Sequence, residues 1–213
     1  MPRRRSSGPL VGALVVAVVI ALVLALVRGT GGGEEIREQM IDAYQGAIEQ
    51  LPEHAPGCEG LTWEVLAGIG RVESHHARGS AIDAFGNTNP RILGPRLDGS
   101  GAGGNVTPIH DTDDGRWDGD TEYDRAVGPM QFIPTSWELY GRDGNGDGVA
   151  DPHNVHDATL AAAVHLCGFS AIDLSDRATL RSAILRYNQS GRYADTVLEH
   201  ADRYAEQYAP QGD

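Results

Sequence analysis

The chain has 213 residues, enough for one globular domain with a hydrophobic core and further segments. Its formal net charge is −13, and the part after residue 28 is more acidic still, because residues 1–28 hold four arginines and no acidic residue. An acidic surface excludes nucleic acid as the expected partner, since phosphates are bound by basic surfaces, and is compatible with a glycan substrate or bound cations.

Residues 1–28 predict a membrane segment. Arg3, Arg4 and Arg5 precede an apolar run of 18 residues, Leu10 to Val27. This length is at the short end of the roughly 17–25 residues that span a bilayer and exceeds the roughly 7–15 of a signal-peptide core. We expect a single-pass signal-anchor, with everything after Arg28 outside the cytoplasm. The alternative is a cleaved signal and a secreted protein.

Periodic apolar residues predict a helical body after the glycine-rich linker 29–33. The first helix runs from Glu34 to Leu51, ended by Pro52 and Pro56, and the second begins after the N-cap Thr62. Strand patterns are nearly absent, so the expected fold class is mainly α, one domain over residues 34–209. Four more helices are expected at 134–140, 157–166 (stopped by Gly168), 176–188 (capped by Ser175) and 193–208.

The segment 79–125 differs from the rest of the body. Gly, Asp, Asn and Pro dominate it, and neither the helical nor the strand period is sustained. A loop this long inside a compact domain is usually functional or disordered. We expect an insertion that faces the substrate, with a mobile flap as the alternative.

Glu73, near the end of the second helix, is the candidate acid. At about 100° per residue its side chain projects between the directions of Ile69 and Leu66, inside the apolar face of the helix. A carboxyl group packed among apolar side chains tends to keep its proton near neutral pH, as a general acid must. The alternative is a surface glutamate whose head reaches water.

Two further segments hold candidate binding residues. In the segment 128–134, polar Gln131 lies among apolar residues and needs hydrogen-bond partners. Its amide either binds a sugar in a cleft or satisfies the backbone of its own loop. Tyr187 and Asn188 end a helix, where, taken alone, the tyrosine packs in the core and the asparagine serves as a C-cap.

The loop that begins at Asp143 predicts a calcium site. Asp143, Asn145 and Asp147 alternate as possible oxygen ligands, and Gly148 allows the tight turn that follows. An EF-hand loop has Glu at its twelfth position, where this chain has Asn154, so the closing arm is longer. The alternative is an empty, solvated turn.

The remaining reactive side chains support few other chemistries. Cys58 and Cys167 are the two cysteines, and in a protein outside the cytoplasm such a pair predicts a disulfide. The histidine pairs 75–76 and 153/156 lack the spacing of a zinc site. No serine-hydrolase elbow and no Walker loop occurs, and no organic cofactor is expected.

Together these segments resemble the lytic murein transglycosylases of the membrane-bound B type, whose fold is lysozyme-like. The resemblance spans residues 58–209, and four motifs in the same order make it specific. The matching motifs are Gly68–Ser74, Ala126–Ser136, the loop motif formed by Asp143–Gly148 with Asp157–Ala158, and Arg186–Ser190.

The resemblance implies roles for individual residues. In that family the glutamate of the first motif is the sole acid/base, which points to Glu73. The implied substrate-binding residues are Gln131 with its neighbour Met130, and Tyr187 with Asn188. An EF-hand-like loop binds structural Ca²⁺ in the family, which maps onto Asp143, Asn145, Asp147, the Val149 carbonyl and Asp157.

The implied reaction cleaves the β-1,4 bond between N-acetylmuramic acid and N-acetylglucosamine in peptidoglycan, leaving a 1,6-anhydro end. Two alternatives stay open. One is a hydrolytic muramidase that adds Asp118, Asp120 or Asp124 to Glu73 as a second acid. The other is a non-catalytic, glycan-binding or Ca²⁺-responsive module.

Overall fold

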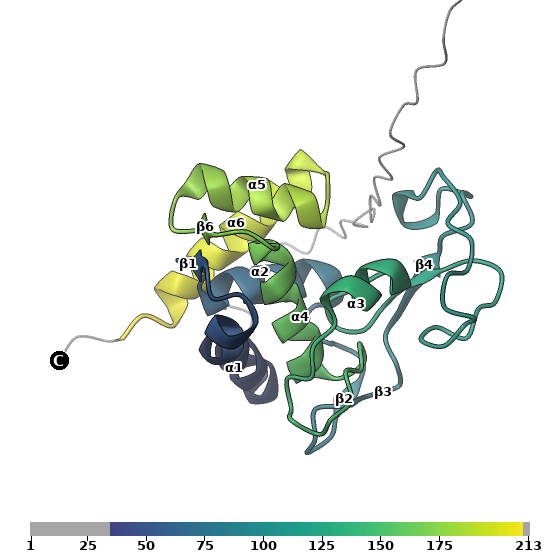
Figure 1. Cartoon of the computed structure of the whole chain (residues 1–213), viewed down its shortest axis with the longest axis horizontal. Coiled ribbons are helices and arrows are strands. Elements are labelled where there is room, and N and C mark those ends of the chain that lie inside the picture. Colours follow the sequence, from purple (N-terminus) through teal and green to yellow (C-terminus); the bar gives the residue numbers. More distant parts are fainter. Residues whose placement is uncertain (1–34, 211–213) are drawn as a thin grey trace, which may run out of the picture.

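The computed structural model describes residues 35–210, and the predicted membrane segment and linker lie outside this part. As predicted, the described part is mainly helical (Figure 1). Within it, no helix is both long and apolar enough to cross a membrane. The elements are α1 (Glu38–His54), β1 (Cys58–Glu59), α2 (Trp63–Ser74), β2 (Ala81–Ile82), β3 (Thr88–Asn89), β4 (Leu93–Arg96), the 3₁₀ turn η1 (Ala102–Gly104), β5 (Arg125–Val127), α3 (Pro134–Tyr140), α4 (Val155–Cys167), β6 (Ile172–Asp173), α5 (Arg177–Tyr187) and α6 (Gly191–Gln207).

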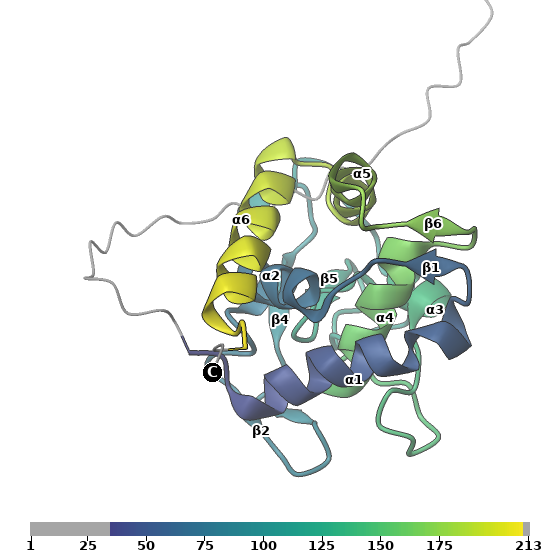
Figure 2. The same cartoon turned by 90° about the vertical axis from the view of Figure 1, so that its left-hand side faces the viewer.

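Helix α4 forms the middle of the core. It is alanine-rich and buried along almost its whole length, as expected of a helix that is apolar on every side. Helix α1 packs against α4, and α2 packs against α6, so two helix pairs enclose the core (Figure 2). Gly68 makes the second contact possible, because a Cβ there would lie 2.5 Å from the carbonyl oxygen of Val197.

The end of α2 is fixed by a turn in the left-handed region. His75, His76 and Ala77 have φ of 54°, 58° and 58°, a conformation that costs energy unless neighbouring groups hold it. The buried His76 ring contacts the hydroxyls of Tyr44 and Tyr204 at 2.9 and 2.8 Å. These contacts tie α1 and α6 to the residues that directly follow Glu73.

Three pairs of short strands complete the fold. Strands β1 and β6 are parallel, whereas β2–β3 and β4–β5 are antiparallel. Cys58 and Cys167 form the predicted disulfide, with Cα atoms 5.5 Å apart, which joins β1 to the end of α4. The segment 79–125, expected to be one long loop, contains three of these strands, the turn η1 and the first residue of β5, and its role as an insertion that faces the substrate stays a prediction. The two- to four-residue length of the strands explains why no alternating pattern is visible in the sequence.

Several helix ends differ from the prediction. Pro52 lies inside the last turn of α1 and does not end the helix, because a proline so close to the terminus removes a single hydrogen bond. Asp176, and not Ser175, caps α5, since its carboxylate accepts the N–H of Thr179. Helix α4 starts at Val155 because the Asn154 side chain caps it. Helices α3 and α6 lie where they were predicted, within two residues at either end.

Candidate active site

The carboxyl group of Glu73 is held asymmetrically at the end of α2. Oε1 accepts a hydrogen bond from the hydroxyl of Tyr193 at 2.6 Å. Oε2 is enclosed and accepts no hydrogen bond within residues 35–210. Burial raises the pKa of Glu73 from 4.5 to about 8, and the hydrogen bond from Tyr193 opposes this rise. The acid is therefore protonated at neutral pH, as the position of Glu73 on the apolar face of the helix predicts.

Tyr193 was not identified from the sequence. It lies in the first turn of α6, which Ser190 caps by accepting its N–H, and its side chain is almost fully buried. Burial and the nearby Glu73 carboxylate raise the pKa of its hydroxyl well above 10. The hydroxyl therefore keeps its proton at neutral pH and is a donor there. In the sequence this residue appears only as the start of the helix expected at 193–208, and its partner is 120 residues away.

A cavity of about 170 Å³ opens beside Glu73 and collects most of the predicted binding residues. Gln131, Tyr187 and Asn188 line it with Glu73. Of the described residues that line it, Glu73 is the only one with a carboxyl group. The other lining residues are Phe132, Ile133, Ser136, His165, Arg186 and Gln189.

Gln131 is placed by a strained turn. Its φ is 51°, and the preceding Gly128 could not be replaced, because its φ is 77° and a Cβ there would collide with the carbonyl of Pro152. The amide Nε2 of Gln131 donates to the carbonyl of Gly128 at 2.9 Å, which is the self-satisfying role considered from the sequence. Its Oε1 has no donor among residues 35–210, although the side chain also lines the cavity.

Met130 lies elsewhere than its predicted role requires. Its side chain is fully buried in the core and does not line the cavity. Its carbonyl accepts the hydroxyl of Tyr187 at 2.7 Å, which connects α5 to the turn of Gln131. Met130 therefore helps to position Tyr187 and the neighbouring Gln131, which both line the cavity. Asn188 does end α5, and its Oδ1 accepts the N–H of Ser190, so it also connects α5 to the cap of α6.

The three aspartates considered as a second acid do not reach this cavity. Asp118 accepts main-chain N–H groups of Asp120 and Arg125, and Asp120 pairs with Arg96. Asp124 is completely buried and binds Thr112 through both of its oxygens. All three stabilise the fold of the segment 111–125, and none lines the cavity of Glu73.

The predicted calcium loop is built around a buried carboxylate. Asp157, at the start of α4, accepts the N–H groups of Gly144 and Asn145 at 2.7 and 3.2 Å. Asp143, Asn145 and Asp147 accept backbone N–H groups within the loop. Their oxygens are hard donors and so fit Ca²⁺ chemically. Val149 is exposed, and its N–H donates to Asp147.

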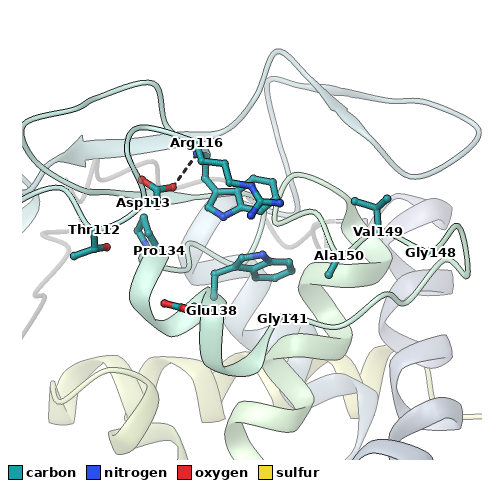
Figure 3. Close-up of a pocket in the computed structure, with 11 residues that line it drawn as sticks. Thr112, Asp113, Arg116, Pro134, Glu138, Gly141, Gly148, Val149 and Ala150 are labelled. Carbon is teal, nitrogen blue, oxygen red and sulfur yellow. Dashed lines mark hydrogen bonds between the residues drawn. The ribbon is translucent and has the colours of Figure 1, made fainter.

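A larger cavity of about 560 Å³ lies between α3 and the segments 112–117 and 148–150 (Figure 3). Pro134, Glu138 and Gly141 line it, whereas Ile133 and Ser136 line the cavity of Glu73. The larger cavity borders a cluster of the carboxylates of Asp111, Asp113 and Asp124, whose oxygens lie within 4.8 Å of one another. Size alone does not identify a catalytic site, and the protonated acid is in the smaller cavity.

The comparisons with known proteins find one family match, which covers part of the chain. Residues 114–169 match the family described as Transglycosylase SLT domain. No curated protein matches the chain. Among solved structures, the chain is similar to the lytic transglycosylase SltB1 of Pseudomonas aeruginosa, with 15% identity over 84% of this chain and 85% of that one and a TM-score of 0.48.

It is also similar to the Escherichia coli lytic transglycosylase SLT35, solved in complex with bulgecin A, with 15% identity, 82% and 76% of the two chains covered and a TM-score of 0.45. The same enzyme in complex with calcium gives the same identity and TM-score, with 82% and 77% covered. The family match covers residues 114–169, and this part of the chain is therefore similar to the Transglycosylase SLT domain.

Proposed function

We propose that this enzyme cleaves the β-1,4 bond between N-acetylmuramic acid and N-acetylglucosamine and leaves a 1,6-anhydro end, with Glu73 as the sole acid/base. The observation that carries the proposal is the isolation of this acid. It is the one carboxyl group among the described residues that line the cavity, and its pKa of about 8 keeps it protonated. A hydrolytic muramidase of the usual kind would need a second carboxylate to activate water or to form a covalent intermediate.

The chemistry requires one group that first gives and then takes a proton. Glu73 protonates the oxygen that leaves the anomeric carbon as the glycosidic bond breaks and an oxocarbenium-like centre develops. The resulting carboxylate then accepts the proton of the muramoyl 6-hydroxyl, whose oxygen bonds to the anomeric carbon and closes the ring. Glu73 regains its proton, and no water is consumed.

The surrounding residues support these steps by orientation. Tyr193 fixes Oε1 of Glu73 and, as a donor, stabilises the carboxylate that forms midway. Gln131 offers Oε1 as an acceptor for a sugar hydroxyl or acetamido N–H, and Tyr187 and Asn188 line the same cavity.

Calcium enters this proposal as a structural ion. SLT35 was solved in complex with calcium, and the oxygen donors of Asp143, Asn145, Asp147 and Asp157 suit the same ion. Bound there, the ion would supply charge neutralisation between the loop and α4. It has no part in the proton transfers.

The proposed location is outside the cytoplasm. The disulfide between Cys58 and Cys167 is of a kind that persists in oxidising compartments. With residues 1–28 as a membrane anchor, 29–33 as a linker and 34–209 as the catalytic domain, the protein is a single-pass enzyme of the cell membrane that binds peptidoglycan strands. Cleavage of the anchor would give a secreted form.

The test compares four variants by zymography on peptidoglycan, with circular dichroism as the control for folding. Glu73→Gln keeps the size of the side chain but removes the transferable proton, so cleavage falls by at least about 10²–10⁴-fold. Asp118→Asn, Asp120→Asn and Asp124→Asn retain cleavage in every molecule that folds. Collapse of cleavage in one folded Asp variant would favour the hydrolase. A wild-type protein without cleavage would favour the glycan-binding module.

A further inference from the structure

Phe169 is an exposed aromatic residue that the fold does not need for its core. It follows the end of α4, and 69% of its surface is accessible to solvent. Its ring is nevertheless ordered by a neighbour, because it stacks on Tyr140 at the end of α3 with an interplanar angle of 11° and a centroid distance of 5.5 Å. One face of the phenyl ring is thus covered, and the other is open to a ligand.

The stack continues inward to the catalytic cavity. Tyr140 stacks on His165 at 4.1 Å, and His165 contacts the ring of Tyr187 at 4.8 Å. His165 and Tyr187 both line the cavity of Glu73. The four rings come from α3, α4 with the loop that follows it, and α5. They therefore form one continuous series of ring contacts from the cavity of Glu73 to the surface, which we name the aromatic row.

The aromatic row carries no charge at neutral pH, and the disulfide holds the chain next to its outer end. Burial and the nearby Arg186 lower the pKa of His165 to about 4, so its ring is uncharged at neutral pH. The disulfide at Cys167 fixes the chain just before Phe169. Beyond Phe169, a second hollow of about 240 Å³ is lined by Phe169 together with His54, Pro56, Gly57, Gly168 and Ser170. The surface next to the ring is therefore concave.

We propose that the open face of Phe169, whose ring is supported by Tyr140, forms an outer saccharide-binding subsite, on which a sugar residue of the glycan strand stacks while the scissile bond lies at Glu73. The C–H faces of a pyranose ring are apolar, whereas its hydroxyl groups point outward and stay in water, so neutral aromatic rings suit it better than they suit an ion. The continuity of the row with the catalytic cavity identifies the occupant as the same strand. This inference rests on the proposed function.

The subsite predicts a dependence on substrate length. Phe169→Ala raises KM for long glycan oligosaccharides about five- to ten-fold, the effect of losing one aromatic contact. For the shortest oligosaccharide that the wild type cleaves, kcat and KM stay unchanged, because such a chain does not reach Phe169. Phe169→Trp restores the wild-type KM for long chains.

The chain offers a matched control in Phe85, which is 73% exposed and belongs to the loop between β2 and β3, where its carbonyl accepts the amide of Asn154. Phe85→Ala leaves both kinetic constants unchanged at every length. An equal effect of Phe169→Ala at all lengths, or none, overturns the subsite. A change in sedimentation without a change in KM also overturns it and assigns the ring to contacts between copies. Failure of the wild type to cleave any length contradicts the proposed function itself.

Discussion

The hydroxyl of Tyr193 donates to one oxygen of Glu73, and the other oxygen of that carboxyl group is enclosed without a hydrogen-bond partner among residues 35–210. One oxygen is therefore fixed, and the other keeps the proton because burial disfavours its loss. Ionisation is costly here but not prohibited, since the tyrosine stabilises the carboxylate once it forms. A single group that must act as acid and then as base needs both properties.

Removing the tyrosine hydroxyl should separate these two effects. Tyr193→Phe keeps the buried ring but removes the donor that lowers the pKa of Glu73. We expect kcat to fall about ten-fold or more, the loss of one hydrogen bond to a charged group, and the basic limb of the pH–rate profile to move to higher pH. The measurement is a pH–rate profile of both proteins on purified glycan strands. An unchanged basic limb would show that Tyr193 has no influence on the acid.

The buried acid should also make folding stability depend on pH. The pKa of Glu73 is about 8 in the folded protein and 4.5 ordinarily, so between these values the folded state binds more protons than the unfolded state. The contribution of Glu73 is therefore fully present below pH 4.5 and is lost as the pH rises through about 8. Glu73→Gln should be more stable than the wild type at pH 9 and similar to it at pH 4. Urea denaturation at the two pH values measures this, and a constant difference would contradict the raised pKa.

These properties of Glu73 show what the sequence contains and what it lacks. Its place beside Ile69 and Leu66 follows from helical periodicity, a local signal, and the buried acid was predicted from it. Tyr193 could not be assigned, because its partner is 120 residues away and only the packing of α2 on α6, allowed by Gly68, brings them together. The lack of a hydrogen-bond partner for Oε2 of Glu73 among residues 35–210 is likewise a property of the assembled site.

Other differences have local physical causes. The strands within residues 79–125 are two to four residues long, too short to show an alternating pattern. The cap of α5 was predicted one residue early, because Ser175 and Asp176 are both good N-cap residues. In the structure the carboxylate of Asp176 caps the helix by accepting the N–H of Thr179. The disulfide, by contrast, followed from the number of cysteines and the compartment, with no knowledge of the fold.

Calcium removal should destabilise the enzyme through the loop of Asp147. EGTA should lower the Tm by several degrees, because an ion bound to the folded state alone stabilises it. Asp147→Ala should show this lowered Tm both with and without EGTA, so that EGTA no longer changes it. Asp113→Asn, in the second carboxylate cluster, is the matched control, and EGTA should still lower its Tm. If Asp113→Asn loses the EGTA effect and Asp147→Ala retains it, the ion binds at the cluster of Asp111, Asp113 and Asp124.

Breaking the disulfide should weaken the fold substantially. Cys58 and Cys167 close a loop across 109 positions, which in the chain-entropy account contributes roughly 4–5 kcal/mol to the free energy of unfolding. We expect Cys58→Ala with Cys167→Ala to unfold at a much lower urea concentration than the oxidised wild type. Alkylation followed by intact-mass measurement checks the bond itself. Two reactive thiols in protein exported from the cytoplasm would contradict it.

The central claim is that Glu73 acts alone and that the substrate's own 6-hydroxyl takes the place of water. Mass spectrometry of the muropeptides released by the wild-type enzyme from purified peptidoglycan tests it most directly. We expect ends of 1,6-anhydro-N-acetylmuramic acid, lighter by one water than hydrolysed ends, and no incorporation of ¹⁸O from labelled water. Muropeptides with reducing ends that carry ¹⁸O would contradict it.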